Sequence, residues 1–186
     1  MSITKQLITR KGSFDAGHRV MNEKMKCFNI HGHTYLYELT FAFNSSKSIG
    51  YPVDFKEIKR VGCEWIERYL DHGFIANPKD KDVIDVVNKL GNKLWIMSLN
   101  GEGQYCNPTV ENIAKELFLA IYYISGGWHK GLNLTEIKVW ETPNCCTTCT
   151  DNSYTQTEAL HFYRAHETEL QKYVKEMGVM DYDDRN

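Results

Sequence analysis

The stretch FDAGHRVMNEKMKCFNIHGHTYLY, residues 14–37, decides the fold and the chemistry expected of this chain. It carries three of the seven histidines, His18, His31 and His33, together with Cys27. Residues 31–43 alternate and are rich in Tyr, Thr, Leu and Phe, which predicts a β-strand. Because side chains at positions i and i+2 of a strand point to one face, His31 and His33 should project side by side.

Two imidazoles on one strand face, with a third on a neighbouring element, are typical of a zinc site. Three protein ligands leave the fourth position of zinc open to water or substrate, which indicates a catalytic rather than a structural site. The alternative is a surface pair of histidines without a metal, because a His-x-His motif discriminates loosely. Cys27 has an alternative too, as a small buried hydrophobic residue.

The composition limits the class of protein. A chain of 186 residues with 42% hydrophobic residues suits one globular domain with a sizeable core. The net charge of -2 argues against a nucleic-acid partner, and no apolar run approaches the roughly 18 residues of a membrane helix. Since residues 1–14 lack the apolar core of a signal peptide, we expect a cytoplasmic protein whose six cysteines form no disulfide framework.

Turn and capping residues divide the rest of the chain into further elements. Asp54 and Thr109 stand where helix N-caps should, and glycines close several segments. Two antiparallel strands, then helices, then further strands predict the α+β class rather than alternating βαβ units. We expect strands over about residues 5–14, 31–43, 94–99 and 134–142, and helices over about residues 55–71, 77–94, 109–127 and 157–177.

Six short motifs occur in order along the chain: FDAGH (14–18), CFNIHGH (27–33), VDF (53–55), LDH (70–72), PTVEN (108–112) and ET (141–142). Together they resemble the 6-pyruvoyl-tetrahydropterin synthase family, and most closely its 6-carboxy-tetrahydropterin synthase branch. The resemblance covers about residues 3–154. It implies the tunnelling fold, or T-fold: a four-stranded antiparallel sheet with helices packed on one face, whose subunits close a barrel and form a homo-hexamer from two trimers. Residues 155–186 would be a helical extension of the same domain, which occupies residues 1–154.

The resemblance also implies a reaction. A zinc-dependent lyase would convert 7,8-dihydroneopterin triphosphate to 6-carboxy-5,6,7,8-tetrahydropterin, with release of acetaldehyde and triphosphate, in queuosine and 7-deazaguanine biosynthesis. His18, His31 and His33 would hold the zinc, and Cys27 would be the general base. The three residues between Cys27 and His31 resemble the 6-carboxy branch.

The same resemblance assigns the remaining candidates. His72 would be the second proton-transfer group, with Asp71 to orient it, although a helix C-terminus also favours a histidine. Glu141 would anchor the pterin through two hydrogen bonds, and otherwise it is an exposed carboxylate at the end of a strand. Thr109 and Glu111 would complete the pterin pocket from a neighbouring subunit, or simply cap a helix.

Three alternatives remain open. The first is the 6-pyruvoyl-tetrahydropterin synthase reaction, which eliminates triphosphate and keeps the side chain. The second is a non-catalytic metal-binding interaction module built on Cys145, Cys146 and Cys149, of which the last two could form half of a structural zinc site. The third is a GTP cyclohydrolase-like relative, which the three-histidine pattern disfavours.

Overall fold

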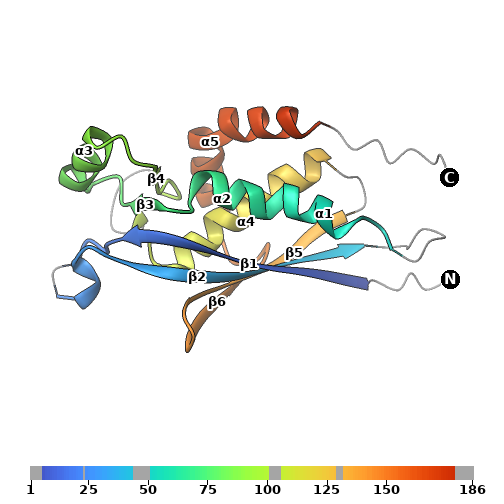
Figure 1. Cartoon of the computed structure of the whole chain (residues 1–186), viewed down its shortest axis with the longest axis horizontal. Helices are drawn as coiled ribbons and strands as arrows, with labels where there is room; N and C mark the ends of the chain where they lie inside the picture. The colour runs from blue at the N-terminus through green and yellow to red at the C-terminus, as the bar shows by residue number, and fades with distance from the viewer. Residues whose placement is uncertain (1–5, 23, 44–50, 101–105, 129–131, 179–186) are drawn as a thin grey trace.

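The computed structural model describes residues 6–22, 24–43, 51–100, 106–128 and 132–178. A single sheet crosses the molecule, and the labelled helices lie on one side of it (Figure 1). The expected α+β class is confirmed, but the expected count of four strands is wrong. The sheet has six strands, in the order β4 (Leu94–Ile96), β3 (Gly73–Ala76), β1 (Gln6–His18), β2 (His31–Phe43), β5 (Leu132–Thr142) and β6 (Cys145–Cys149).

The long antiparallel pair β1–β2 carries the candidate site. Its register places Phe14 opposite Tyr35 and His18 opposite His31. Phe14 and Tyr35 are buried and stack with ring centroids 4.9 Å apart, whereas the residues that alternate with them are more exposed. The face of β1–β2 that forms the core therefore also carries the histidines, at the end of the pair.

The additional strands are short. β3 runs parallel to the last three residues of β1, and β4 runs parallel to β3. A strand at residues 73–76 was not predicted, and β6 was recognised only as a cysteine cluster, because three to five residues give too little alternation to identify a strand. In the described part of the chain β4 and β6 are the edges of the sheet, and closure of a barrel between subunits remains a prediction.

The helix predicted after Asp54 is divided into three parts. Its N-cap is as expected, since the Asp54 carboxylate accepts a hydrogen bond of 2.8 Å from the N–H of Lys56. α1 (Phe55–Ile58) passes into a π-helical turn, η2 (Lys59–Cys63), and then into α2 (Glu64–Tyr69). Gly62 in η2 lies so close to β2 that a Cβ would be 2.3 Å from a methyl group of Leu39. A glycine therefore allows this turn to pack directly on the sheet.

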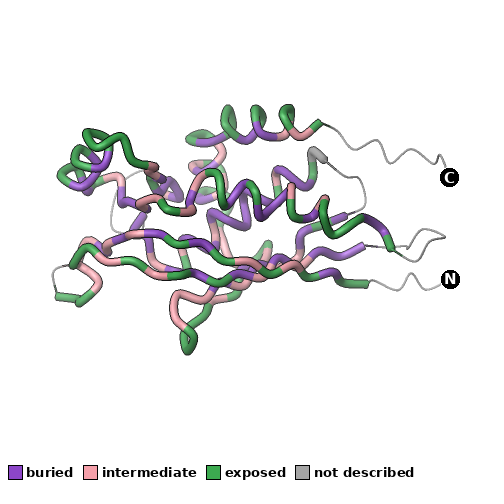
Figure 2. The backbone as a smooth tube through the Cα atoms, in the orientation of Figure 1, coloured by how far each residue is buried: buried purple, intermediate pink, exposed green. Residues whose placement is uncertain are grey.

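The longest predicted stripe of apolar residues forms the centre of the core. α4 (Val110–Trp128) packs on β5, and Figure 2 shows it as largely buried. α3 (Lys81–Lys89) is shorter than predicted, and η1 (Lys26–Phe28) is a single 3-10 turn. The predicted positions of α4 that are buried are Val110, Ile113, Ala114, Leu117, Phe118 and Ile121.

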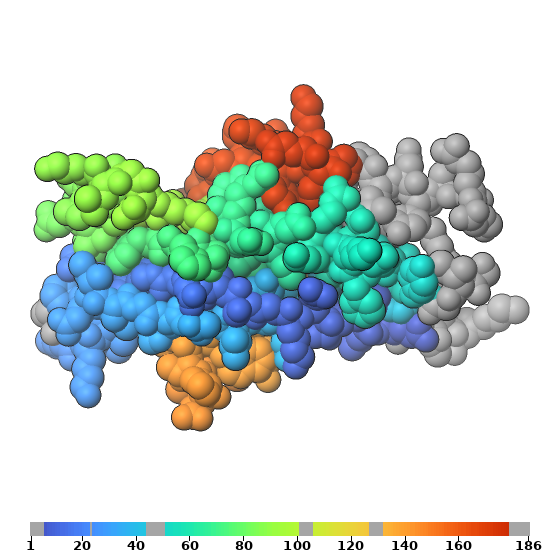
Figure 3. Space-filling model, viewed as in Figure 1, coloured from blue at the N-terminus to red at the C-terminus, as the bar shows by residue number. Residues whose placement is uncertain are grey.

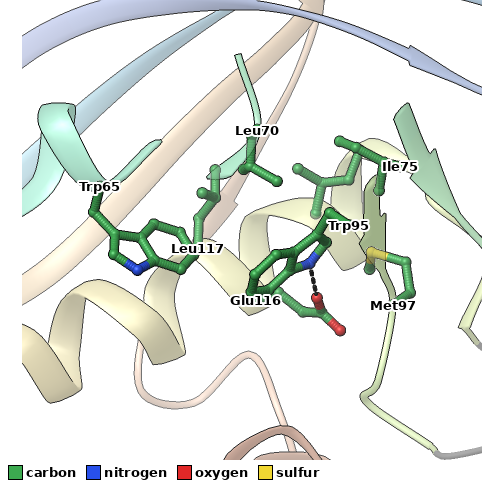
Figure 4. Close-up of a pocket in the computed structure, with 8 residues that line it drawn as sticks. Trp65, Leu70, Ile75, Trp95, Met97, Glu116 and Leu117 are labelled. Atoms are coloured by element: carbon green, nitrogen blue, oxygen red, sulfur yellow. Dashed lines mark hydrogen bonds between the residues drawn. The ribbon is translucent and has the colours of Figure 1, made fainter. Parts of the chain in front are cut away.

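One carboxylate is enclosed in this core. Glu116 of α4 accepts a hydrogen bond of 2.6 Å from the indole N–H of Trp95 (Figure 4). It accepts another, also of 2.6 Å, from the N–H of Ser98. Burial raises the pKa of Glu116 to about 7, although these hydrogen bonds oppose the rise. The cavity beside it has a volume of only about 10 Å³, so it has room for one water molecule at most and not for a pterin.

α5 (Gln156–Met177) lies on the outside of the molecule, above the segment of α1 and α2 in Figure 3. It begins with a capping box between Thr155 and Glu158, and it packs on α4. Phe162 is fully buried, and the Lys115 ammonium lies 2.7 Å from the Glu158 carboxylate. α5 is therefore held on α4 by contacts within its own chain. None of the described helices is both long and apolar enough to cross a membrane.

Candidate metal centre and active site

Three imidazole rings meet where β1 ends and β2 begins. The ring centroids are 4.5 Å apart for His18 and His31, 4.9 Å for His31 and His33, and 5.2 Å for His18 and His33. One nitrogen of each ring lies within 4.8 Å of those of the other two. The register explains this convergence, since His18 and His31 are cross-strand partners and His33 follows on the same face.

Backbone carbonyls orient two of these rings. Nδ1 of His18 donates to the carbonyl of Pro108 over 2.7 Å, and Nδ1 of His31 donates to the carbonyl of Asn29 over 2.7 Å. Because a carbonyl can only accept, the proton is on Nδ1 and the lone pair is on Nε2, as in most metal-binding histidines. Nothing in the sequence marks these two carbonyls, since every residue type presents one.

The ring nitrogens fit a metal ion. The Nε2 atoms of His18 and His33 are buried and have no hydrogen-bond partner. Burial lowers the pKa of His18 to about 4, with a further lowering by the two neighbouring rings, although the hydrogen bond to Pro108 opposes it. The His18 ring is therefore neutral near pH 7. Neutral imidazole nitrogens that converge in a partly buried site are the donors that zinc prefers.

Glu141 lies beside the rings. Its Oε1 is 3.7 Å from Nε2 of His18 and 3.9 Å from Nε2 of His33, which is too long for hydrogen bonds. The pairing of β5 with β6 shifts between Trp140 and Thr142, so Glu141 sits at a β-bulge. A bulge redirects a side chain at the end of a strand, and here the carboxylate faces the histidines.

Cys27 lies in η1, and its side chain is partly exposed. Its carbonyl accepts a hydrogen bond of 2.7 Å from the N–H of Val20, which ties the turn to the end of β1. Tyr35 was missed as a candidate, although its position two residues after His33 is a signal that it shares that face. Its buried hydroxyl has no partner, and burial, followed by the charges of Glu141 and Cys27, raises the pKa of Tyr35.

Asp71 and His72 form a pair whose ligand atoms do not converge with those of the three histidines. Nδ1 of His72 lies 2.7 Å from Oδ2 of Asp71, and Oδ1 of Asp71 accepts from the N–H of Asp15 over 2.8 Å. The Asp15 carboxylate accepts from the Thr34 hydroxyl, and both residues alternate with the inward-facing positions of β1 and β2. The pair therefore clusters with Asp15 on the face opposite to His33.

The backbone explains why Asp71 and His72 touch. Neighbouring side chains on a helix diverge, but α2 ends at Tyr69, earlier than predicted. His72 has a φ of 56°, and its N–H donates to the carbonyl of Asp15 over 2.7 Å. The His72 side chain is 77% exposed, so it is available to another molecule. Partial burial opposes ionisation of Asp71, but the hydrogen bonds from Asp15 and His72 outweigh it and lower its pKa.

Thr109 and Glu111 begin α4. The carbonyl of Thr109 accepts from the N–H of Ile113, and its hydroxyl lies 3.5 Å from the N–H of Asn112, a weak capping contact. Glu111 is exposed in the first turn. The capping interpretation therefore holds for Thr109, and the exposed Glu111 could reach only a molecule outside its own chain or a ligand at the surface.

The three cysteines on β6, all among the described residues, do not converge on one another. Cys146 is exposed and Cys149 is buried, as expected for residues three apart on a strand, which face opposite ways. Among the described residues, Cys145, Cys146 and Cys149 do not belong to any group whose ligand atoms converge. The structure thus favours separate thiols over half of a structural zinc site.

An open depression of about 370 Å³ lies on the surface around His72. Its wall includes Asp15, Gly32, His33 and Thr34. A Cβ at Gly32 would be 3.0 Å from the carbonyl oxygen of Ala16, so this glycine lets the two strands approach closely. The volume is in the range of small-molecule sites.

Comparison with known proteins places this geometry in context. The model of the family described as 6-pyruvoyl tetrahydropterin synthase matches residues 7–152. The 6-carboxy-5,6,7,8-tetrahydropterin synthase of Rickettsia conorii is 36% identical over 141 residues, which cover 74% of this chain and 94% of that protein. A protein of the same name from Haemophilus influenzae is 27% identical over 142 residues, covering 73% of this chain and 92% of that protein.

A solved structure agrees with the fold. The structure of Caenorhabditis elegans 6-pyruvoyl tetrahydropterin synthase covers 82% of this chain and 99% of its own, with a TM-score of 0.56 and 18% identity. At that identity the similarity concerns the fold alone. The family match ends before α5, so this helix lies outside the part of the chain that the family model describes.

Proposed function

This chain belongs to the 6-pyruvoyl tetrahydropterin synthase family of enzymes, and we propose that its reaction is that of the 6-carboxy-5,6,7,8-tetrahydropterin synthases. The substrates are 7,8-dihydroneopterin triphosphate and one molecule of water, and the products are 6-carboxy-5,6,7,8-tetrahydropterin, acetaldehyde and triphosphate. The observation that carries the proposal is the convergence of three imidazole rings beside Glu141, in a chain whose relatives carry that name.

His18, His31 and His33 would hold zinc through their Nε2 atoms. When bound there, zinc would supply a Lewis acid that stabilises developing negative charge on a side-chain oxygen of the substrate. Two of the three rings are already oriented, since the carbonyls of Pro108 and Asn29 hold His18 and His31 by Nδ1.

Glu141 would accept two hydrogen bonds from the amino-pyrimidine edge of the pterin. Because this carboxylate lies within 4 Å of two ring nitrogens, a pterin bound to it has its side chain close to the histidines. Cys27, four residues before His31, would remove the side-chain proton as a thiolate. His72, oriented by Asp71, would carry the second proton transfer.

We further propose that His72 acts on the triad of a neighbouring subunit. In its own chain it clusters with Asp15, whose side chain points to the opposite face from His33, and its ring is exposed. The expected homo-hexamer of two trimers would bring this face to another subunit, together with the exposed Glu111 and with Thr109 as parts of the pterin pocket.

A product assay coupled to metal analysis tests the reaction. Purified protein is incubated with 7,8-dihydroneopterin triphosphate, and the pterin product is identified by mass. We expect the 6-carboxy product and bound zinc, with loss of product but not of zinc in Cys27→Ala. A product that keeps its three-carbon side chain would support the 6-pyruvoyl reaction. Zinc retained after replacement of both His31 and His33 would instead support a metal-linked interaction module.

Mixed oligomers test the shared site. Cys27→Ala and His72→Ala proteins are dissociated together, reassembled and assayed. If each site takes these residues from different subunits, random mixing gives about a quarter of the sites both wild-type residues. Activity should then return to roughly a quarter of the wild-type value. If both residues act within one chain, mixing restores nothing.

The cellular context follows from the same proposal. We propose a cytoplasmic enzyme of queuosine and 7-deazaguanine biosynthesis, with a pterin synthase domain over residues 1–154 and a helical extension over residues 155–186. Deletion of the gene should remove queuosine from transfer RNA, and expression of the chain should restore it. Queuosine that persists without the gene would exclude this role.

A further inference from the structure

Asp80 begins α3, but its carboxylate turns away from that helix. Its carbonyl accepts the first helical hydrogen bond, of 3.0 Å, from the N–H of Ile84, yet its side chain makes no capping bond. Aspartate at this position normally caps the helix with its carboxylate. Here the side chain is 1% exposed, so a buried charge has been directed to another partner.

That partner is Arg19, the residue after His18. Nε of Arg19 donates to Oδ2 of Asp80, and a terminal guanidinium nitrogen donates to Oδ1 over 2.6 Å. Both carboxylate oxygens are therefore bound by one guanidinium in a bidentate pair, which fixes orientation as well as distance. This arrangement also commits Arg19, which lies near Cys27 in the sequence, to Asp80 rather than to a phosphate.

The guanidinium in turn contacts the turn that carries Cys27. The central carbon of Arg19 lies 5.0 Å from the centroid of the Phe28 ring. The N–H of Val20, two residues after the end of β1, also ties this turn by a hydrogen bond of 2.7 Å to the carbonyl of Cys27. None of the residues of η1 is buried, so core packing does not hold this turn in place.

We propose that Asp80 is a positioning residue for Cys27. Asp80 fixes Arg19, and Arg19 holds Phe28 and with it the η1 turn, so that the backbone that carries the Cys27 thiol is kept in one position. This inference rests on the proposed role of Cys27 as the general base. A nucleophile or base displaced by about 1 Å can lose roughly a hundredfold in rate, whereas binding groups elsewhere are unaffected.

The test compares Asp80→Asn with Asp85→Asn. Asp85 is exposed on the same helix, so its replacement makes the same change in charge without touching Arg19. The full-length, zinc-loaded variants are assayed for kcat, KM and zinc content, and hydrogen exchange is followed in residues 20–29 by mass spectrometry. For Asp80→Asn we expect kcat to fall roughly tenfold or more, with KM and zinc within about twofold of wild type, and faster exchange in the turn.

Other outcomes overturn the inference. The inference is wrong if kcat of Asp80→Asn stays within about twofold of kcat of Asp85→Asn. It is also wrong if the zinc content or KM changes by as large a factor as kcat. If Asp80→Asn does not fold, Arg19→Lys replaces it, since lysine keeps the charge but cannot form the bidentate pair, and the same results are expected. If the wild-type protein makes no 6-carboxy product, the proposed function fails. Unchanged hydrogen exchange in residues 20–29 of Asp80→Asn would separately refute the proposal that Asp80 positions the turn.

Discussion

Replacement of Glu116 by Gln should remove the loss of stability that this buried carboxyl causes as pH rises. The folded-state pKa of Glu116 is raised from 4.5 to about 7 because the side chain is completely buried. Between these two values the unfolded chain has released the proton and the folded chain retains it. Stability is therefore highest below the unfolded pKa and is lost as pH rises toward 7.

The size of this loss follows from the difference in pKa. At ~1.36 kcal/mol per pKa unit, a rise from 4.5 to about 7 corresponds to about 3 kcal/mol, of which roughly 2.5 kcal/mol falls between about pH 5 and pH 8. Glutamine cannot ionise. It also offers one acceptor oxygen where Glu116 offers two, to Trp95 and to Ser98, so the variant should be less stable by about 1–3 kcal/mol at pH 5.

The assay is urea unfolding of wild type and Glu116→Gln at several pH values, at one protein concentration and in one metal state. The low pKa of His18 acts in the opposite direction, since its stabilising effect is lost as pH falls from 6.5 to about 4, but it is common to both proteins. Between about pH 5 and pH 8, the free energy of unfolding of wild type should therefore fall by roughly 2.5 kcal/mol relative to that of Glu116→Gln. Glu111→Gln, an exposed change on the same helix, is the control. A difference that stays constant with pH would refute the reasoning.

Three further substitutions, two of them paired with a control on a helix, test the site and the packing. His33→Ala should reduce bound zinc, measured by elemental analysis, to near zero, because two protein ligands rarely retain zinc through purification; stoichiometric zinc in this variant would contradict the ligand set. Gly62→Ala should cost about 1–3 kcal/mol in urea unfolding, since its Cβ would be 2.3 Å from a buried leucine of β2. Gly126→Ala, with nothing within 4 Å, should stabilise α4 by up to ~1 kcal/mol, and equal effects of the two alanines would contradict the packing. Phe162→Ala should cost about 3–5 kcal/mol, while Leu160→Ala, 48% exposed on the same helix, should cost far less; a small loss for Phe162→Ala would mean that α5 is not docked in solution.

The sequence by itself determined what neighbouring residues enforce on one another. Because side chains alternate between the two faces of a strand, the sequence placed His31 and His33 on one face. The motifs, in their order along the chain, identified the family. The apolar spacing of α4 and the capping role of Asp54 were correct for the same reason, because helix periodicity and caps act over a few residues.

Only the tertiary structure decided how distant segments meet. The carbonyl that orients His18 belongs to Pro108, 90 residues away, and every residue has such a carbonyl. The separation of His72 from the histidine triad depends on the early end of α2 and on the face that Asp15 occupies. The pairing of Asp80 with Arg19 replaces the local capping bond that the sequence favours, because a buried carboxylate is stabilised more by a guanidinium than by one backbone N–H.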